Sequence, residues 1–486
     1  MAPVEKIMVK WGTFHKQITL TEQQQSILEK DDHLVILHGP PGTGKTSLLM
    51  IKGLQWLKAG KDVIVFARGD YSIPSSRLIY LQLSEAREAS QGSLSPDAQT
   101  WGRVLYERVN ILNAATLDSA MQAVKKHGKK DVHLIMDNII AEGVSYYQEL
   151  QQEFLTKLKD QIPGLHLWGA DWVTTVPDGY SRHILNEPLR YHKGLVYNVN
   201  FSVLELCQMG VCPETHQYSR HKISPELCKL PEGPKVVHVN HKGKGQQDKW
   251  PVDSEECGHR VAELLRSIGV GGDGGKASPA ASSTADQTSS GSYDYRDVLV
   301  ITRSAVDRNS PPAFARGLEA SGIPTNVFGH SGSYGTLEDA FDDAILGKEN
   351  KVTVMNFKAA MGLDRKVVVC LIGVVGQDEA YELPKPEKKK RGEHHYPITM
   401  TFTRDVSPGV QVTQSVTMTG RPMSKKERKA QESVLKNQME IKQRGSIYSR
   451  CTDRLIVVHM PPGFEEGPHG PYNGAGGGQS MKCVIL

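Results

Sequence analysis

Residues 39–46 read GPPGTGKT, a glycine-rich loop that ends in a lysine and a threonine. The loop lies between an apolar run at 34–37 and a second apolar segment that begins at Leu48. Glycines at this spacing let the backbone curl, so that successive N–H groups converge on phosphate oxygens at the start of a helix. Lys45 would pair with the β- and γ-phosphate oxygens, and the Thr46 hydroxyl would ligate Mg²⁺. The pattern therefore predicts a site for a nucleoside triphosphate with Mg²⁺.

A carboxylate for the same metal ion ends the strand-like run VHLIMD at 132–137. Asp137 closes this run, where a phosphate-loop protein has the acidic residue that holds Mg²⁺. The next residue is Asn138, whose amide can hydrogen-bond a water molecule but cannot accept its proton. We therefore expect hydrolysis to be slow or to need another base. Glu142 could be that base, although a solvated glutamate at the start of a helix is the alternative interpretation.

Length and composition limit what surrounds these residues. A chain of 486 residues is too long for one ordinary core and predicts two or three domains. It has no apolar run long enough to span a membrane, and its N-terminus lacks the apolar core of a signal peptide, so we expect a cytoplasmic protein. Seven cysteines at irregular spacing favour reduced thiols over a disulfide framework. The net charge of +4 permits contact with polyanions without predicting it.

Short β-branched runs followed by helical patterns recur along the chain. This alternation predicts an α/β fold with parallel sheets in two similar halves. The predicted strands are 62–67, 132–137, 165–171, 194–199, 297–303, 351–357, 366–373 and 454–460.

Polar, low-complexity stretches divide these halves. Residues 269–292 are rich in Gly, Ser, Ala and Thr and cannot bury enough surface to fold. A period-two stretch from Tyr396 to Gly420 predicts a β-hairpin, and a charged helix is predicted near 424–442. The predicted domains are an N-terminal domain at 1–235, the start of a second domain at 236–268, a disordered linker at 269–292, a C-terminal domain at 293–460 with an insertion at about 376–445, and a flexible tail at 461–486.

Seven segments in this order carry a family pattern. They are LTEQQQSIL at 20–28, GPPGTGKT at 39–46, MDNI at 136–139, GADW at 169–172, LNEPLR at 185–190, NFKAAMGLD at 356–364 and YSRCTDRLIVV at 448–458. Their order resembles the motor core of superfamily 1 helicases, closest to the UvrD/Rep type. The resemblance covers most of the chain and implies two RecA-like P-loop domains that bind ATP and Mg²⁺ and act on single-stranded nucleic acid.

The resemblance also implies roles for individual residues. Gln24 matches the adenine-reading glutamine, and Asp171 matches the residue that senses the γ-phosphate. Arg190 and Arg450 match two arginines that contact the γ-phosphate from the two domains, so that nucleotide would control domain closure. The expected phosphate-binding residues are Gly39, Gly42, Thr43, Gly44, Lys45 and Thr46, with Thr46 and Asp137 holding Mg²⁺.

Several positions depart from the family pattern. Asn138 replaces the glutamate that follows the metal-binding aspartate. Further departures, some of which couple ATP to nucleic acid in the family, are Ile140, Thr174, Lys358 and Met361. The stretch at 71–130 is also too short for the accessory subdomain that splits duplexes in full-length relatives. We therefore do not expect processive unwinding.

The last four residues, Cys483 to Leu486, form a C-a-a-X box whose terminal leucine favours geranylgeranylation of Cys483. A glycine-rich spacer precedes the box, while a free cysteine on an exposed tail is the alternative interpretation. One lipid with only Lys482 beside it would hold the protein at a membrane reversibly. Three basic runs elsewhere are interpreted as solvated surface rather than as a nuclear signal.

A cluster of cysteines and histidines is the remaining candidate for metal binding. Its spacing fits no standard zinc pattern, so we do not expect zinc. The cluster consists of Cys207, Cys212, His216, His221 and Cys228.

Two functions from different classes fit the sequence. The first is an ATPase of helicase type that acts on nucleic acid, with Lys45, Asp137, Arg190 and Arg450 as its catalytic residues. The second is a nucleotide-dependent switch or scaffold that recruits a protein partner at a membrane. The intact loop and the arginines favour the first, whereas Asn138 and the C-a-a-X box favour the second.

Overall fold

The computed structural model describes the fold over a defined part of the chain. The described residues are 7–11, 14–18, 20–30, 32–69, 72–91, 101–109, 111, 114–127, 131–139, 145–171, 176–187, 189, 237–240, 251–271, 293–302, 310–328, 338–356, 359–360, 363–371, 397–407, 410–419 and 451–459. The chain divides into two compact units, one of residues Met1–Gly376 with Gln438–Leu486 and one of Gln377–Asn437.

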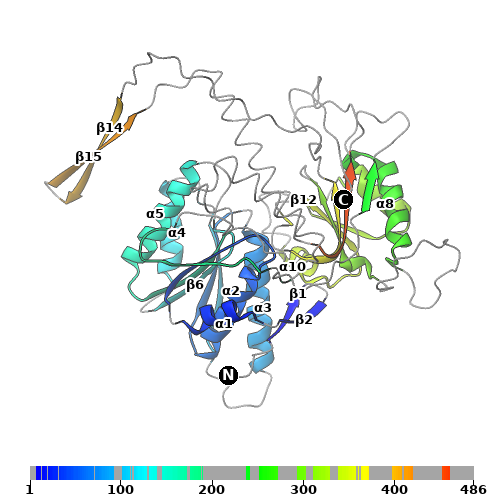
Figure 1. The fold of residues 1–486 in the computed structure, drawn as a ribbon, viewed down its shortest axis with the longest axis horizontal. Helices are drawn as coiled ribbons and strands as arrows, with labels where there is room; N and C mark the ends of the chain where they lie inside the picture. The colour runs from blue at the N-terminus through cyan, green and yellow to red at the C-terminus, as the bar shows by residue number, and fades with distance from the viewer. Residues whose placement is uncertain are drawn as a thin grey trace. The chain divides into compact units, whose positions relative to one another are not determined.

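The N-terminal half of the first unit contains a six-stranded parallel sheet (Figure 1). Its strands are β3 (Leu34–His38), β4 (Val63–Ala67), β5 (Val104–Arg108), β6 (Val132–Met136), β7 (Leu165–Ala170) and β8 (Ser181–Ile184). They lie in the order β5-β4-β6-β7-β3-β8. The helices described beside them are α1 (Glu22–Glu29), α2 (Lys45–Lys58), α3 (Ile73–Gln91), α4 (Ala114–Lys125) and α5 (Ser145–Gln161).

Both faces of this sheet are buried, which explains why its central strands are continuous apolar runs. Alternate side chains of a strand point to opposite faces. In β3, Val35 and Leu37 share a core cluster with side chains of α2 and α3, whereas Ile36 shares one with α4 and α5. Two layers of helices therefore sandwich the sheet and hold the ends of its strands in fixed positions.

A second six-stranded parallel sheet follows. Its strands are β9 (Val237–Asn240), β10 (Val298–Thr302), β11 (Thr325–Phe328), β12 (Val352–Asn356), β13 (Arg365–Leu371) and β16 (Cys451–His459), in the order β11-β12-β10-β13-β16-β9. The helices described with it are α8 (Glu255–Ser267), α9 (Ala313–Ala320) and α10 (Glu338–Leu346), with short 3₁₀ helices η4 (Pro251–Asp253) and η5 (Tyr295–Asp297).

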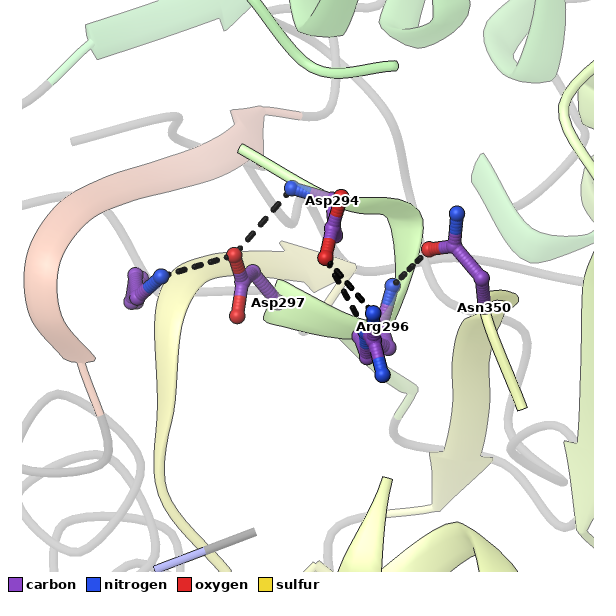
Figure 2. Close-up of polar contacts among 5 residues, drawn as sticks. Asp294, Arg296, Asp297 and Asn350 are labelled. Atoms are coloured by element: carbon purple, nitrogen blue, oxygen red, sulfur yellow. Dashed lines mark hydrogen bonds and ion pairs between the residues drawn. The ribbon is translucent and has the colours of Figure 1, made fainter. Parts of the chain in front are cut away.

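A polar network holds the start of β10 beside β13 (Figure 2). Asp297 is buried, and its carboxylate accepts hydrogen bonds from Lys366 Nζ at 2.9 Å and from the Asp294 amide at 3.1 Å. The Arg296 side chain donates to Asp294 at 3.0 Å, and its amide donates to the Asn350 side chain at 3.2 Å. The charge of Asp297 is thus balanced where the chain enters the sheet.

Three histidines lie side by side at the amino ends of β3, β6 and β7. The glycine-rich loop lies at the other edge of the sheet, where β3 ends. His133 on β6 pairs in register with His166 on β7, and their rings stack with centroids 4.5 Å apart. His33, just before β3, lies with its Nδ1 atom 2.9 Å from that of His166. Trp56 of α2 covers the His133 ring. Burial and, to a smaller extent, the charge of His166 lower the pKa of His133 to about 4.

Two antiparallel pairs complete the described structure. β1 (Ile7–Trp11) pairs with β2 (Phe14–Ile18). β14 (Pro397–Ser407) pairs with β15 (Val410–Thr419) in the second compact unit, as the period-two pattern predicts. No helix among the described residues has the length and apolar character needed to cross a membrane.

Most of the predicted strands are confirmed. Three of the four in the first half correspond to β4, β6 and β7. The fourth, 194–199, lies outside the described residues. The four in the second half correspond to β10, β12, β13 and β16. The predicted helix at 424–442, the part of the predicted linker at 269–292 that follows residue 271, and the tail at 461–486 lie outside the described residues. Val270, at the start of that linker, is described and buried. The predicted fold class, two α/β domains with parallel sheets, is confirmed by the two strand orders.

Candidate functional site

The glycine-rich loop joins β3 to α2. Gly39, Gly42 and Gly44 have φ angles of 136°, 84° and 85°, in the region of backbone space that residues with a Cβ rarely adopt. Helix α2 begins directly after Gly44, at Lys45, and runs for 14 residues. The first amides of such a helix have no partners within it, and its dipole favours negative charge there. The loop therefore has the geometry of a phosphate-binding site.

The segment that follows β8 lies against this loop. The Leu185 amide donates to the His38 carbonyl at 2.8 Å, and the Leu189 amide donates to the Gly42 carbonyl at 3.0 Å. A Cβ atom at Gly39 would overlap the carbonyl oxygen of Leu185. Glycine at position 39 is therefore required by close approach as well as by its φ angle.

Lys45, Thr46 and Asp137 meet at the mouth of the loop. Lys45 Nζ donates to the carbonyl oxygens of Gly39 and Pro40 at 2.6 Å and 2.8 Å. The Thr46 hydroxyl donates to Asp137 Oδ2 at 2.8 Å. Asp137 is buried and follows β6, which is separated from β3 by one strand, β7. The Thr46 hydroxyl and the Asp137 carboxylate offer the hard oxygen ligands that Mg²⁺ prefers. Lys45 beside them offers a positive charge for phosphate, so these residues fit a nucleotide with Mg²⁺.

Asn138 forms a tight turn directly after Asp137. Its φ angle of 51° lies in the left-handed region, which asparagine tolerates better than other residues with a side chain. Its amide N–H donates to Asp137 Oδ1 at 3.0 Å, and its side-chain Nδ2 donates to the Ser75 hydroxyl at 3.1 Å. Because the Ser75 hydroxyl donates to the Ser72 carbonyl, it can only accept from Asn138. The orientation of the Asn138 amide is thus determined by Ser75.

Arg68 is a buried charge at this site that sequence reasoning did not identify. It follows β4, and its Nη1 atom donates to the Ile139 carbonyl at 2.6 Å. Burial lowers the pKa of the Arg68 guanidinium to about 10, while the nearby Asp171 carboxylate opposes this shift. Arg68 therefore stays charged at neutral pH. Its position after a central parallel strand, where sites in such sheets gather, was the available signal.

Asp171 lies just beyond β7. Its amide donates to the Leu37 carbonyl at 2.9 Å, which holds it beside the strand that enters the loop. The residue is buried. A carboxylate here, with Arg68 as its neighbouring positive charge, can respond to the charge of a bound phosphate.

Gln24 connects helix α1 to the loop. Its side-chain oxygen accepts from the Thr21 amide at 3.1 Å, as part of a capping box. Its Nε2 atom donates to the Thr43 carbonyl at 3.1 Å, and the Thr43 hydroxyl donates to the Pro40 carbonyl at 2.8 Å. Gln24 is 2% exposed. In this arrangement its amide supports the helix and the loop.

Arg190, Arg450 and Cys483 lie outside the described residues, as does the cluster from Cys207 to Cys228. Within the described part of the chain, no group of three or more potential ligands could hold a metal ion by itself. The structure thus brings together the residues expected from the first domain: Gln24, Gly39, Gly42, Thr43, Gly44, Lys45, Thr46, Asp137 and Asp171.

These features define the class of protein. The chain has a P-loop fold of two RecA-like α/β domains, in which the strand β7 separates the loop strand β3 from the aspartate strand β6. No family model and no curated protein matches the chain.

Comparison with solved structures gives remote likenesses. S. cerevisiae Dbp5 bound to RNA and ADP BeF3 is 12% identical with a TM-score of 0.35, over 74% of this chain and 76% of that chain. The Pyrococcus furiosus Hef helicase domain is 14% identical with a TM-score of 0.26, over 72% and 88%. The type ISP restriction-modification enzyme LlaBIII bound to DNA is 11% identical with a TM-score of 0.31, and this chain spans 26% of it. Because these TM-scores are low, the fold assignment rests on strand order and loop geometry.

Proposed function

We propose that this protein binds ATP with Mg²⁺ and is a superfamily 1 helicase-like NTPase that hydrolyses ATP slowly and acts on nucleic acid. The observation that carries the proposal is the hydrogen bond between Thr46 and Asp137, beside Lys45. It joins residues 91 positions apart in the chain into one oxygen-rich site at a helix N-terminus. Nucleotide binding is the part of the proposal that depends only on residues in this site.

Each of these residues has a role in binding the triphosphate. Lys45 would exchange the carbonyl oxygens of Gly39 and Pro40 for phosphate oxygens. The Thr46 hydroxyl and Asp137 would hold Mg²⁺, which when bound neutralises charge on the β- and γ-phosphates. We assign Gln24 to the side of the site that faces the base, and Asp171 to the γ-phosphate.

Arg190 and Arg450 complete the proposed catalytic set. Each would contact the γ-phosphate from one of the two domains, so that charge developing in the transition state is stabilised only when the domains close. This assignment rests on the resemblance, whereas the proposed domain boundaries at 235, 268, 292 and 460 follow the breaks in composition along the chain. Single-stranded DNA or RNA is the expected nucleic acid for the same reason.

Slow hydrolysis follows from Asn138. Its amide can orient a water molecule, but it cannot remove the proton of that water, and a general base contributes about 10²–10⁴ in rate. The bond from Asn138 Nδ2 to Ser75 leaves the amide oxygen as the group that could accept a hydrogen bond from water. Electrostatic stabilisation by the lysine and arginines would then carry most of the catalysis.

A membrane-associated switch is the second candidate function. It is favoured by Asn138 and by the C-a-a-X box at Cys483, which are compatible with a protein that binds ATP and recruits a protein partner without rapid turnover. In that case a single prenyl chain would give reversible membrane association. The cytoplasm remains the expected location for both candidates.

Calorimetric titration of the full-length protein with ATP and Mg²⁺ tests the first step, and ATP turnover with and without single-stranded DNA or RNA tests the second. We expect binding, a low basal rate and stimulation by nucleic acid. Absence of ATP binding would overturn the whole proposal. Binding without any stimulation would favour the membrane-associated switch.

A further inference from the structure

Helix α3 of the first sheet is joined to helix α10 of the second by an ion pair. Arg77 donates to Asp342 in a bidentate manner, with Nε to Oδ1 at 2.7 Å and Nη2 to Oδ2 at 2.6 Å. The two side chains are 15% and 11% exposed, so the pair is largely removed from water. Bidentate arginine–carboxylate pairs of this kind are strong and directional. The contact joins residues 265 positions apart in the chain.

Two tyrosines hold the Arg77 guanidinium in place. Its central carbon lies 5.0 Å from the ring centroid of Tyr80 and 5.3 Å from that of Tyr106. Tyr80 belongs to α3, whereas Tyr106 belongs to β5, the edge strand of the same sheet. The guanidinium is therefore ordered by its own domain before it meets Asp342, which lowers the entropy cost of the pair.

The same turn of α3 also contacts the nucleotide site. Ser75 is buried and accepts the hydrogen bond from Asn138 Nδ2 at 3.1 Å. Residues two positions apart project about 200° apart around a helix. Ser75 can therefore face Asn138 while Arg77 faces Asp342 on the other side of the helix.

We infer that the first turns of α3 form a relay that couples ATP binding at the P-loop to the Arg77–Asp342 ion pair. This inference rests on the proposed function. In the arrangement described here, the Thr46 hydroxyl donates to Asp137, and Asp137 accepts from the amide of Asn138. ATP with Mg²⁺ competes for Thr46 and Asp137. A shift of Asp137 moves Asn138, and the Ser75 bond passes that movement to α3.

The direction of the coupling follows from linkage. The ion pair is formed in the same arrangement in which Lys45 is bonded to the loop carbonyls and Thr46 to Asp137. In the relay, the ion pair stabilises that arrangement. A ligand that must displace these bonds therefore binds more weakly while the pair is intact. Removing the pair should strengthen ATP binding. By linkage, ATP should lower the equilibrium constant for forming the Arg77–Asp342 pair by the same factor and so loosen α10.

Titration calorimetry with ATP and Mg²⁺ on the full-length protein tests the relay. Asp342→Asn removes the charge of the pair, Ser75→Ala removes the link to Asn138, and a double variant combines them. We expect Asp342→Asn to lower the Kd for ATP by about five-fold, the lower end of typical allosteric coupling. In the Ser75→Ala background the same substitution should change the Kd by less than about two-fold, because the path is cut.

Glu255→Gln is the matched control. It removes the Arg316–Glu255 pair, an arginine–carboxylate contact between α8 and α9 that does not involve α3, with a 2.8 Å Nε–Oε1 distance. Its Kd for ATP should equal that of the wild type. Thermal unfolding of every variant confirms that it is folded.

Hydrogen–deuterium exchange supplies an independent readout. ATP should increase deuterium uptake in the peptide that covers α10 in the wild type, but not in Ser75→Ala. If Asp342→Asn leaves the Kd unchanged, or changes it equally with and without Ser75, the relay is wrong although ATP binding stands. If the wild type binds no ATP, the proposed function fails and the relay fails with it.

Discussion

Replacing Asn138 with glutamate tests whether this residue occupies the position of the missing general base. The substitution adds a carboxylate beside Asp137, where it could accept a proton from water that attacks the γ-phosphate. It also removes the bond from Asn138 Nδ2 to Ser75 and requires glutamate to adopt a φ angle near 51°. The outcome depends on whether the catalytic gain exceeds the conformational cost.

The two magnitudes can be compared. A general base contributes about 10²–10⁴ in rate, or about 2.7–5.4 kcal/mol at 1.36 kcal/mol for each factor of ten. Left-handed backbone costs a residue other than glycine, asparagine or aspartate about 1–2 kcal/mol. The hydrogen bond lost to Ser75 costs up to about 1.5 kcal/mol more. Set against the middle of the range for the gain, about 10³ in rate or about 4.1 kcal/mol, the two largest costs leave about 0.6 kcal/mol, which is about three-fold in rate. We therefore expect Asn138→Glu to raise ATP turnover by about this factor.

Asn138→Gln is the matched control for this measurement. Glutamine has the length and backbone strain of glutamate but cannot accept a proton. Steady-state phosphate release at saturating ATP should be faster for Asn138→Glu than for Asn138→Gln and for the wild type. Both variants should unfold at a lower temperature than the wild type, because both lose the present Ser75 geometry and both carry strain. A glutamate variant no faster than the glutamine variant would show that position 138 is not that of the base.

Three further predictions concern the P-loop, the histidines and the tail. Lys45→Ala should abolish calorimetric binding of ATP with Mg²⁺, because it removes the charge that pairs with the phosphates; equal affinities in wild type and variant would contradict this. The pKa of His133 is lowered to about 4 in the folded protein from about 6.5 in the unfolded chain, so the unfolded chain binds more protons between these values. The unfolding temperature should therefore fall as the pH falls through this window, and less steeply in His133→Phe; identical slopes would rule His133 out as the cause. Cys483→Ser should abolish membrane association and leave ATP binding intact. If mass spectrometry detects only an unmodified C-terminal peptide in protein from eukaryotic cells, the prediction of prenylation is wrong.

The central strands could be predicted from sequence because a buried strand is a short, continuous run of apolar residues. β6 and β10 are buried along their whole lengths, and a strand covered on both faces must be a continuous apolar run. The edge strands β5 and β8 gave no comparable signal. Their residues are mostly half-exposed, so their sequences VLYER and SRHI have no apolar pattern to detect. Their strand conformation is decided by pairing with β4 and β3.

The sequence by itself determined the residue types of the candidate nucleotide site, because a P-loop needs glycines, a lysine and a threonine at fixed spacing within one segment. It also determined that an asparagine, Asn138, follows Asp137, the residue that we propose to hold Mg²⁺. Only the tertiary structure decided which side chains surround these residues. Arg68 reaches Ile139, and Ser75 orients Asn138, because strand order brings the ends of β4 and β6 together with the start of α3. The Arg77–Asp342 pair depends on contact between elements 265 residues apart, and no local pattern of residue types specifies a contact at that separation.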